Sequence, residues 1–142
     1  MKIGIMGGTF NPIHNAHLLI AEMAREEYGL DRVIFITDGN PPHKSANVTA
    51  KQRFEMTHIA IADNSAFEED DFEINRSEKS YTVNTLGYLK EKYPNDDLFF
   101  IIGEDSLNDF DKWYKPDKIL EMCSLLVFPR KSLKSLTETI KA

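Results

Sequence analysis

The 142-residue sequence has a single cysteine, Cys123, so no disulfide can form within the chain. Cys123 stands in an apolar run, where a buried thiol is expected, and this cysteine usage fits a reducing cytoplasm. The sequence also lacks an apolar stretch near the ~18 residues of a membrane span. Met1-Lys2 leads directly into a short apolar segment, so no signal peptide is expected. We therefore expect a cytoplasmic protein with no membrane partner.

Positive charge is scarce as well, with 17 Lys and Arg against 23 Asp and Glu and a formal net charge of −6. Surfaces that bind nucleic acids without sequence preference are basic, so the charge balance argues against a nucleic-acid partner. Any anionic ligand must then be held by local groups. The chain has no internal repeat and no interdomain linker, and its hydrophobic share of 42% is typical of globular proteins. We expect one domain spanning residues 1–142.

Apolar and amphipathic segments alternate along the chain, which is the pattern of an α/β fold. Strands are expected at residues 2–6, 32–37, 72–74, 98–102 and 124–128, with 98–102 the best candidate for a central strand. Helices are expected at residues 18–28, 50–62, 83–93, 105–110 and 118–122. Gly29 should end the first helix, and Thr82 should cap the third. The nearly continuous apolarity of the strands is typical of parallel strands covered on both faces, so we predict a doubly wound, mostly parallel sheet.

Two polar features are expected to be structural. His58 falls on the apolar side of the helix predicted at 50–62, where a packed histidine is more common than a ligand. The run Glu68–Asp71 is expected to form a solvated loop, because four adjacent carboxylates more often face solvent than hold a metal. We therefore expect no metal site made of protein side chains.

The most informative stretch runs from Gly7 to His17 and has the sequence GGTFNPIHNAH. It joins a strand to a helix, and ligands in open α/β sheets bind at such turns. The two glycines let a ligand approach the backbone, and His14 and His17 are spaced to share one face beside the helix N-terminus. Free N–H groups at that end favour phosphate. With the Thr9 hydroxyl these groups make an anion site, although His-x-x-His alone also fits a capping turn with surface histidines.

Three further polar features follow expected strands or a short helix. The loop DGNPPHK at 38–44 leaves the same edge of the sheet, and its two prolines present Lys44 from a stiff backbone. Taken alone, this loop is equally well an ordinary proline-rich loop. Asp105 is placed either to accept hydrogen bonds from ribose hydroxyls or to cap the short helix. Trp113 has polar neighbours and offers a stacking face, whereas a lone tryptophan is usually part of the core.

Together these segments resemble the bacterial nicotinate-nucleotide adenylyltransferases, a family of the nucleotidylyltransferase superfamily that joins nicotinate mononucleotide to the AMP part of ATP. The stretch from Gly7 to His17 is similar to the superfamily signature G-x-F-x-P-x-H-x-G-H. Three more pieces resemble this family rather than its pantetheine-phosphate and cytidylyl relatives. They are PPHK at 41–44, Arg76 with SYT at 80–82 and TL at 85–86, and IIGED at 101–105 with Leu107, Phe110 and Trp113.

The resemblance implies a Rossmann-like fold and a role for each matched residue. It assigns the catalytic contacts with the ATP phosphates to His14 and His17. Contacts with ATP or its phosphates are implied for Gly7, Gly8, Thr9, Phe10, Lys44, Gly103 and Asp105. Contacts with nicotinate mononucleotide are implied for Tyr81, Thr82, Trp113 and Tyr114, with Trp113 stacking on the ring. Mg²⁺ is expected to travel with ATP.

The sequence departs from the family pattern in three places. Asn11 stands where the family usually has Asp, and Ala16 stands where the superfamily has Gly. The chain stops before the family's Ser/Thr-rich C-terminal motif, which Thr137–Lys141 resembles only superficially. We expect loss of that motif to impair ATP use. It should also expose apolar surface, which favours association into a homo-oligomer. The alternatives are a pantetheine-phosphate adenylyltransferase-like enzyme, or a truncated nucleotide-binding domain with little or no catalysis.

Overall fold

Strands and helices alternate along a computed structural model that describes residues 1–8, 10, 13, 15–39, 49–75 and 81–128. The strands are β1 (Lys2–Gly8), β2 (Arg32–Thr37), β3 (Phe67–Asp70), β4 (Asp97–Gly103) and β5 (Ser124–Phe128). The helices are α1 (Asn15–Tyr28), α2 (Ala50–Ile61), α3 (Thr82–Lys92), α4 (Glu104–Asn108), α5 (Pro116–Met122) and the 3₁₀ turn η1 (Phe110–Lys112). Within these ranges we find no helix that combines the length and the apolarity needed to cross a bilayer.

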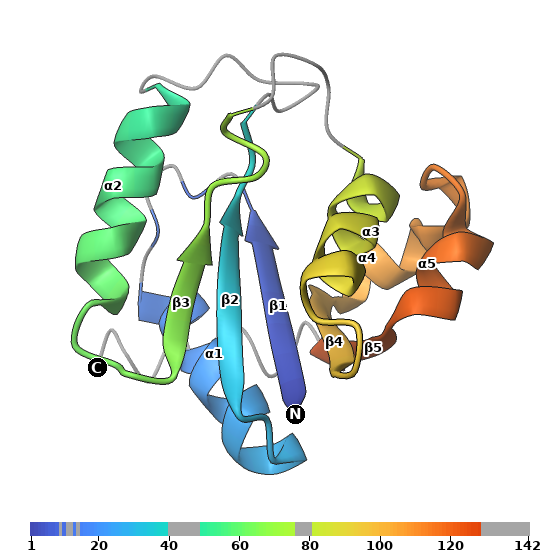
Figure 1. Cartoon of the computed structure of the whole chain (residues 1–142), viewed down its shortest axis with the longest axis horizontal. Helices are drawn as coiled ribbons and strands as arrows, with labels where there is room; N and C mark the ends of the chain where they lie inside the picture. The colour runs from blue at the N-terminus through green and yellow to red at the C-terminus, as the bar shows by residue number, and fades with distance from the viewer. Residues whose placement is uncertain (9, 11–12, 14, 40–48, 76–80, 129–142) are drawn as a thin grey trace.

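All five described strands form one parallel sheet in the order β3-β2-β1-β4-β5. Figure 1 shows the arrowheads of β1, β2 and β3 at the same edge. The doubly wound parallel sheet predicted from the sequence is therefore confirmed, but its middle strand is β1. The strand predicted as central, β4, lies beside it. Because the strand order reverses at β1, the carboxyl end of β1 is where an open α/β sheet places a ligand.

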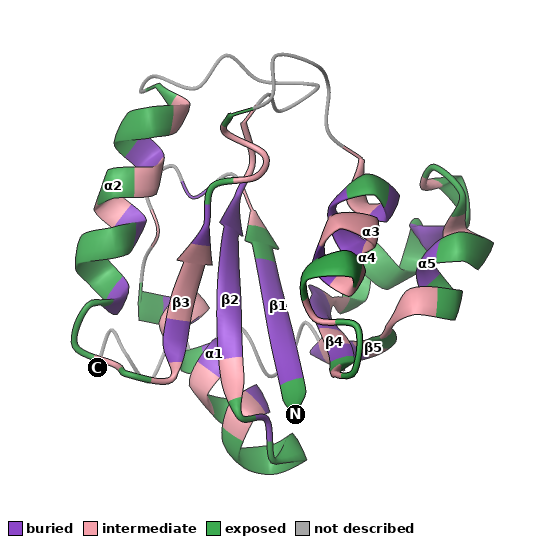
Figure 2. Cartoon of the chain, viewed as in Figure 1, coloured by how far each residue is buried: buried purple, intermediate pink, exposed green. Residues whose placement is uncertain are grey.

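Alternate residues of the strands build two apolar layers, one on each face of the sheet. On one face Met6, Val33 and Phe35 pack beneath α1 and α2. On the other face Ile5 and Ile34 pack against α3 and α5 together with their neighbours. Figure 2 shows β1 and β2 buried along most of their length. Burial on both faces explains why these strands are almost continuously apolar in sequence.

Local signals account for most helix boundaries. Gly29 follows α1 with a φ of +65°, a left-handed conformation that glycine adopts without strain. A capping box opens α2, because the Gln52 N–H donates to Thr49 Oγ1 at 3.1 Å and the Thr49 N–H donates to Gln52 Oε1 at 3.0 Å. The N-cap of α3 is Tyr81, which makes no side-chain capping bond, so the cap predicted at Thr82 is one residue off.

The segment after α2 differs most from the prediction. The predicted loop at 68–71 is largely the edge strand β3, and the predicted strand at 72–74 is a turn. Phe67 anchors β3 in the core, and the three carboxylates that follow have partners. Glu68 binds Arg32 at 3.1 Å, and Asp70 accepts hydrogen bonds from the hydroxyl of Tyr88 and from a lysine of α3. Because their charges are balanced within the fold, these carboxylates are compatible with a strand.

His58 is not packed as predicted, since its side chain is 74% exposed. The buried side of α2 is formed by Arg53, Thr57 and Ile61, which places His58 one position further round the helix. Its Nδ1 lies 2.9 Å from Oε1 of Glu69, a residue whose side chain is only 4% exposed. Burial raises the pKa of the Glu69 carboxyl. His58 therefore provides a surface partner for a buried acid.

Candidate active site

A cavity of about 200 Å³ lies at the carboxyl edge of the sheet, where the strand order reverses. Its floor consists of apolar side chains from β1, β2, α3 and β4. Its polar lining comes from Gly7, Gly8, Asp38, Glu73, Thr82 and Thr85. Residues far apart in the sequence therefore meet beside the turn after β1, where the sequence predicts a ligand.

The glycines at the end of β1 leave the backbone open to the cavity. A Cβ atom on Gly8 would lie 3.0 Å from the ring of Phe10, so a side chain there would crowd the turn. The Asp38 N–H donates to the carbonyl of Gly8 at 2.9 Å, which ties the ends of β1 and β2 together. Gly7 and Gly8 therefore line a cavity after β1, and their contact with ATP stays a prediction.

Phe10 and His17 are in contact beside this turn. Phe10 is 3% exposed and has a φ of +48°, and its ring packs against Phe35 and edge to face against His17. His17 is half-buried in the first turn of α1, a turn with no acidic residue. The core therefore supports the imidazole of His17 from below. Because the Phe10 ring faces the core, the nucleotide contact predicted for Phe10 would involve its backbone.

Three of the predicted phosphate ligands lie outside the described residues. They are Thr9, His14 and Lys44. Gly103 is the last residue of β4 and the N-cap of α4, so the alternative in which Asp105 caps that helix is wrong. Asp105 is exposed in the first turn of α4, and its contact with a ribose stays a prediction.

The residues predicted to hold the nicotinate ring gather around the start of α3. The rings of Tyr81 and Tyr114 lie with their centroids 4.6 Å apart. Trp113 is half-buried and packs against Phe110 at 5.0 Å and Phe100 at 6.0 Å. Since Phe100 also lines the cavity, Trp113 stands behind its wall rather than in a polar neighbourhood. Thr82 lines the cavity directly.

Two acidic residues in the cavity were not identified as site residues from the sequence. Asp38 directly follows β2, so its place at a strand's carboxyl end was a usable signal. Glu73 belongs to the turn after β3, and its Oε2 accepts a hydrogen bond of 2.6 Å from the hydroxyl of Thr85. Its position could not be predicted, because it depends on where β3 ends.

A buried arginine lies next to the cavity. Arg53 of α2 is 2% exposed, and its Nη1 donates to the carbonyl oxygen of Asp38 at 2.7 Å. Burial lowers the pKa of the Arg53 guanidinium, but an arginine keeps its charge in proteins. The Asp38 carboxylate interacts electrostatically with this buried positive charge, so the two charges offset each other at the cavity edge.

The sheet topology and the cavity at its reversal point define a Rossmann-like α/β domain. The model of the cytidylyltransferase-like family matches residues 5–141. A probable nicotinate-nucleotide adenylyltransferase of Citrifermentans bemidjiense is 48% identical over 144 residues, which cover 99% of this chain and 67% of that protein. A second, from Pelobacter propionicus, is 51% identical over 132 residues, which cover 92% of this chain and 61% of that protein. The chain belongs to the nicotinate-nucleotide adenylyltransferase family and spans about two thirds of the length of these relatives.

The solved structures show the same fold. The nicotinic acid mononucleotide adenylyltransferase of Plasmodium falciparum, in complex with NaAD, superposes on this chain with a TM-score of 0.80 at 23% sequence identity. The superposition covers 94% of this chain and 70% of that one. The predicted Rossmann-like fold is therefore confirmed by comparison as well as by topology.

Proposed function

We propose that this protein transfers the adenylyl group of ATP to nicotinate mononucleotide, giving nicotinate adenine dinucleotide and pyrophosphate, a step of NAD biosynthesis. The observation that carries the proposal is the cavity at the reversal point, which brings Gly7, Gly8 and Thr82 together from separate motifs. The family of the chain supports the same reaction.

The reaction itself needs little from the protein besides placement. A phosphate oxygen of the mononucleotide forms a bond to the α-phosphorus of ATP, while the bond from that phosphorus to the bridging oxygen of the β-phosphate breaks. Pyrophosphate leaves with the electron pair of that bond. The attacking phosphate is already ionised at neutral pH, so no general base is required. Catalysis then consists of in-line positioning and of stabilising charge on the phosphoryl oxygens.

On the ATP side, we propose that His17 donates a hydrogen bond to a phosphate oxygen from the first turn of α1. That turn carries no acidic side chain to compete with an anion. The N-terminus of a helix favours phosphate as well. His14, Thr9 and Lys44 are proposed to complete this set, with Gly103 and Asp105 near the ribose.

On the other side of the cavity, α3 begins with an N-cap, Tyr81, that makes no side-chain capping bond. We propose that the nicotinate carboxylate lies at the first turn of α3, because a helix N-terminus favours an anion. Thr82, the first residue of α3, would bind the nicotinate group at the same place. We place the nicotinate ring near Tyr114 and Trp113, whose aromatic neighbours hold them in position.

Magnesium is proposed to accompany ATP. Among the described residues, no group of three or more His, Cys, Asp and Glu side chains is arranged to hold a metal ion. The carboxylate of Glu73 is engaged by Thr85. The phosphate oxygens would therefore supply the ligands, and the ion would withdraw charge from the departing pyrophosphate.

Pyrophosphate release from ATP, Mg²⁺ and nicotinate mononucleotide tests the proposal directly. We expect turnover by the wild type, a loss of at least about a hundredfold in His17→Ala, and little change in His58→Ala, which removes an exposed imidazole of α2 away from the cavity. Turnover with pantetheine phosphate but not with nicotinate mononucleotide would instead assign the protein to that related activity. Calorimetric binding of ATP with no turnover at high protein concentration would indicate a binding domain.

A further inference from the structure

We infer that Glu73 is a positioning residue that sets the separation of the two walls of the cavity and thereby the binding of the mononucleotide. One wall is the end of β2 with Asp38, which Gly39 follows in the chain, and the other is formed by Thr82, Thr85 and Leu86 of α3. Glu73 contacts both. The expected effect on mononucleotide binding rests on the proposed function, whereas the effect on the position of α3 does not.

The side chain of Glu73 holds the α3 wall. Its Oε2 accepts a hydrogen bond of 2.6 Å from Thr85 Oγ1, a short bond of the kind formed by hydroxyls with ionised carboxylates. Thr85 is buried and follows Thr82 by three residues, so both lie on the helix face that lines the cavity. Fixing Thr85 therefore also fixes the first turn of α3 and the N–H groups at its start.

The backbone of Glu73 holds the β2 wall. A Cβ atom added to Gly39 would lie 2.2 Å from the Glu73 carbonyl oxygen and 3.0 Å from the Cα of Ile74, so the two chain segments are in direct contact. Asp38 is fixed independently, through its N–H to Gly8 and its carbonyl to Arg53. The β2 wall is thus tied to β1 and α2 and rests against Glu73.

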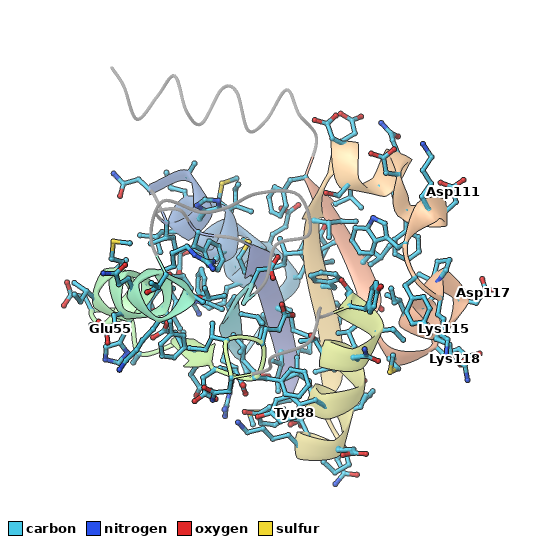
Figure 3. The ribbon with its side chains drawn as sticks, turned by 90° about the horizontal axis from the view of Figure 1, so that it is seen from above. Glu55, Tyr88, Asp111, Lys115, Asp117 and Lys118 are labelled. Atoms are coloured by element: carbon cyan, nitrogen blue, oxygen red, sulfur yellow. The ribbon has the colours of Figure 1, made fainter. Side chains whose placement is uncertain are left out.

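The turn that carries Glu73 is itself anchored. The ring of Phe72 stacks on Tyr88 with centroids 4.2 Å apart, and the Phe72 N–H donates to Asp70 Oδ1 at 2.9 Å. Figure 3 shows Tyr88 on α3 and Glu55 on α2, on opposite sides of the sheet when viewed from above. Glu73 itself joins α3, which covers one of these faces, to the segment that follows β2 in the sheet. Without its carboxylate, the contact of the turn with α3 through Phe72 remains, but the hydrogen bond between Glu73 and Thr85 of α3 is lost.

Two explanations for a role of Glu73 make different predictions. If Glu73 positions α3, an amide that still accepts a hydrogen bond from Thr85 should replace it. If instead its negative charge matters for a substrate that carries a phosphate and a carboxylate, the amide should behave like alanine. Glu73→Gln and Glu73→Ala therefore separate the two, and Thr85→Ser and Thr85→Val provide the matched pair on the partner.

Steady-state kinetics give the first test. We expect Glu73→Ala and Thr85→Val each to raise the KM for nicotinate mononucleotide about tenfold, with less than about a twofold change in the KM for ATP. Glu73→Gln and Thr85→Ser should stay within about threefold of the wild type. The double variant Glu73→Ala/Thr85→Val should be no worse than either single variant, because both remove the same bond. Additive effects, or a wild-type KM in Glu73→Ala, would overturn the inference.

Amide hydrogen exchange gives a second test that does not require activity. We expect faster exchange at residues 82–86 in Glu73→Ala, with unchanged exchange at residues 89–92. Tyr88→Phe is the control, because it removes the Tyr88–Asp70 bond from the same helix and leaves the cavity lining intact. If the wild type fails to use nicotinate mononucleotide, the proposed function fails while exchange still decides the role of Glu73. Unchanged exchange at 82–86 in Glu73→Ala would contradict that role.

Discussion

The phenyl ring of Phe10 meets the imidazole of His17 edge to face, with ring centroids 5.2 Å apart. To make this contact the chain holds a buried aromatic residue at a φ of +48°, a conformation that L-residues rarely adopt. The position of His17 is therefore set by the core beneath it as well as by the helix that carries it.

Replacing Phe10 by alanine should damage both stability and activity. Loss of a buried phenylalanine costs about 3 kcal/mol of unfolding free energy, measurable by urea denaturation. Because the support of His17 is lost as well, kcat should fall even at temperatures where the variant is fully folded. Phe67→Ala is the control, since Phe67 packs on Phe35 in the same core but does not touch His17. An equal loss of kcat in both variants would show that the contact with His17 has no special role.

Glycine at position 39 should be irreplaceable, whereas glycine at position 87 should not. Gly39→Ala forces a methyl group against the Glu73 carbonyl, so we expect a lower thermal midpoint and weaker mononucleotide binding. Gly87 lies within α3 with open space around its Cα, so Gly87→Ala should raise the unfolding free energy by about 0.5 kcal/mol. Thermal denaturation of both variants checks the pair. A neutral Gly39→Ala would mean that the two segments separate easily.

The bond between Lys92 and Asp70 should stabilise the fold in a defined pH range. The hydrogen bond that the Lys92 ammonium group donates to Asp70 raises the pKa of Lys92 from 10.5 to about 12. Because the folded pKa lies above the unfolded value, the stabilisation is complete below about pH 10.5 and is lost as the pH rises through about 12. Urea midpoints of wild type and Lys92→Met should therefore differ at neutral pH and converge in that range. Lys112→Met, which removes an exposed lysine near Asp109, should give no such convergence.

Cys123 should react slowly in the folded protein. Burial raises the pKa of its thiol to about 11, and the thiol donates to the carbonyl of Ile119 at 3.4 Å. The reactive thiolate is therefore a very small fraction at pH 8. We expect iodoacetamide to label the native protein much more slowly than the urea-unfolded protein, as followed by mass spectrometry. Equal rates would contradict the shielding of Cys123.

Most of the fold could be predicted because apolar runs in the sequence mark most of its strands. The strands β1, β2, β4 and β5 were placed to within two residues, since their burial on both faces demands apolar runs. The edge strand β3 was missed because Glu68, Glu69 and Asp70 suit a strand only through partners on other elements. A local pattern cannot show such partners, and the same limit explains the outward position of His58.

Some residues of the candidate site could be predicted from local motifs, and others depend on contacts between distant segments. Gly7, Gly8 and Thr82 were predicted to contact a ligand and they line the cavity, because short motifs at strand ends and helix starts determine their positions; the contacts themselves stay predictions. Glu73 was missed because it reaches the cavity from a turn and contacts residues 34 positions before it and 12 after it. Trp113 was predicted to have polar neighbours, because Asp111, Lys112 and Lys115 flank it in the sequence, whereas its ring packs on Phe100 and Phe110.

The pairing of β1 has a consequence for how the protein is made. In the central ladder Lys2 lies opposite Asp97, and the N-terminal ammonium group binds Asp96 at 2.8 Å. During synthesis β1 precedes both of its partner strands, so it can pair with β2 early, but its other edge has no partner strand until β4 has been made. Closing so long a loop is entropically costly, and an apolar strand with an open edge can pair with other chains. We expect folding to be limited by the arrival of β4, with the nascent chain most prone to aggregation just before it.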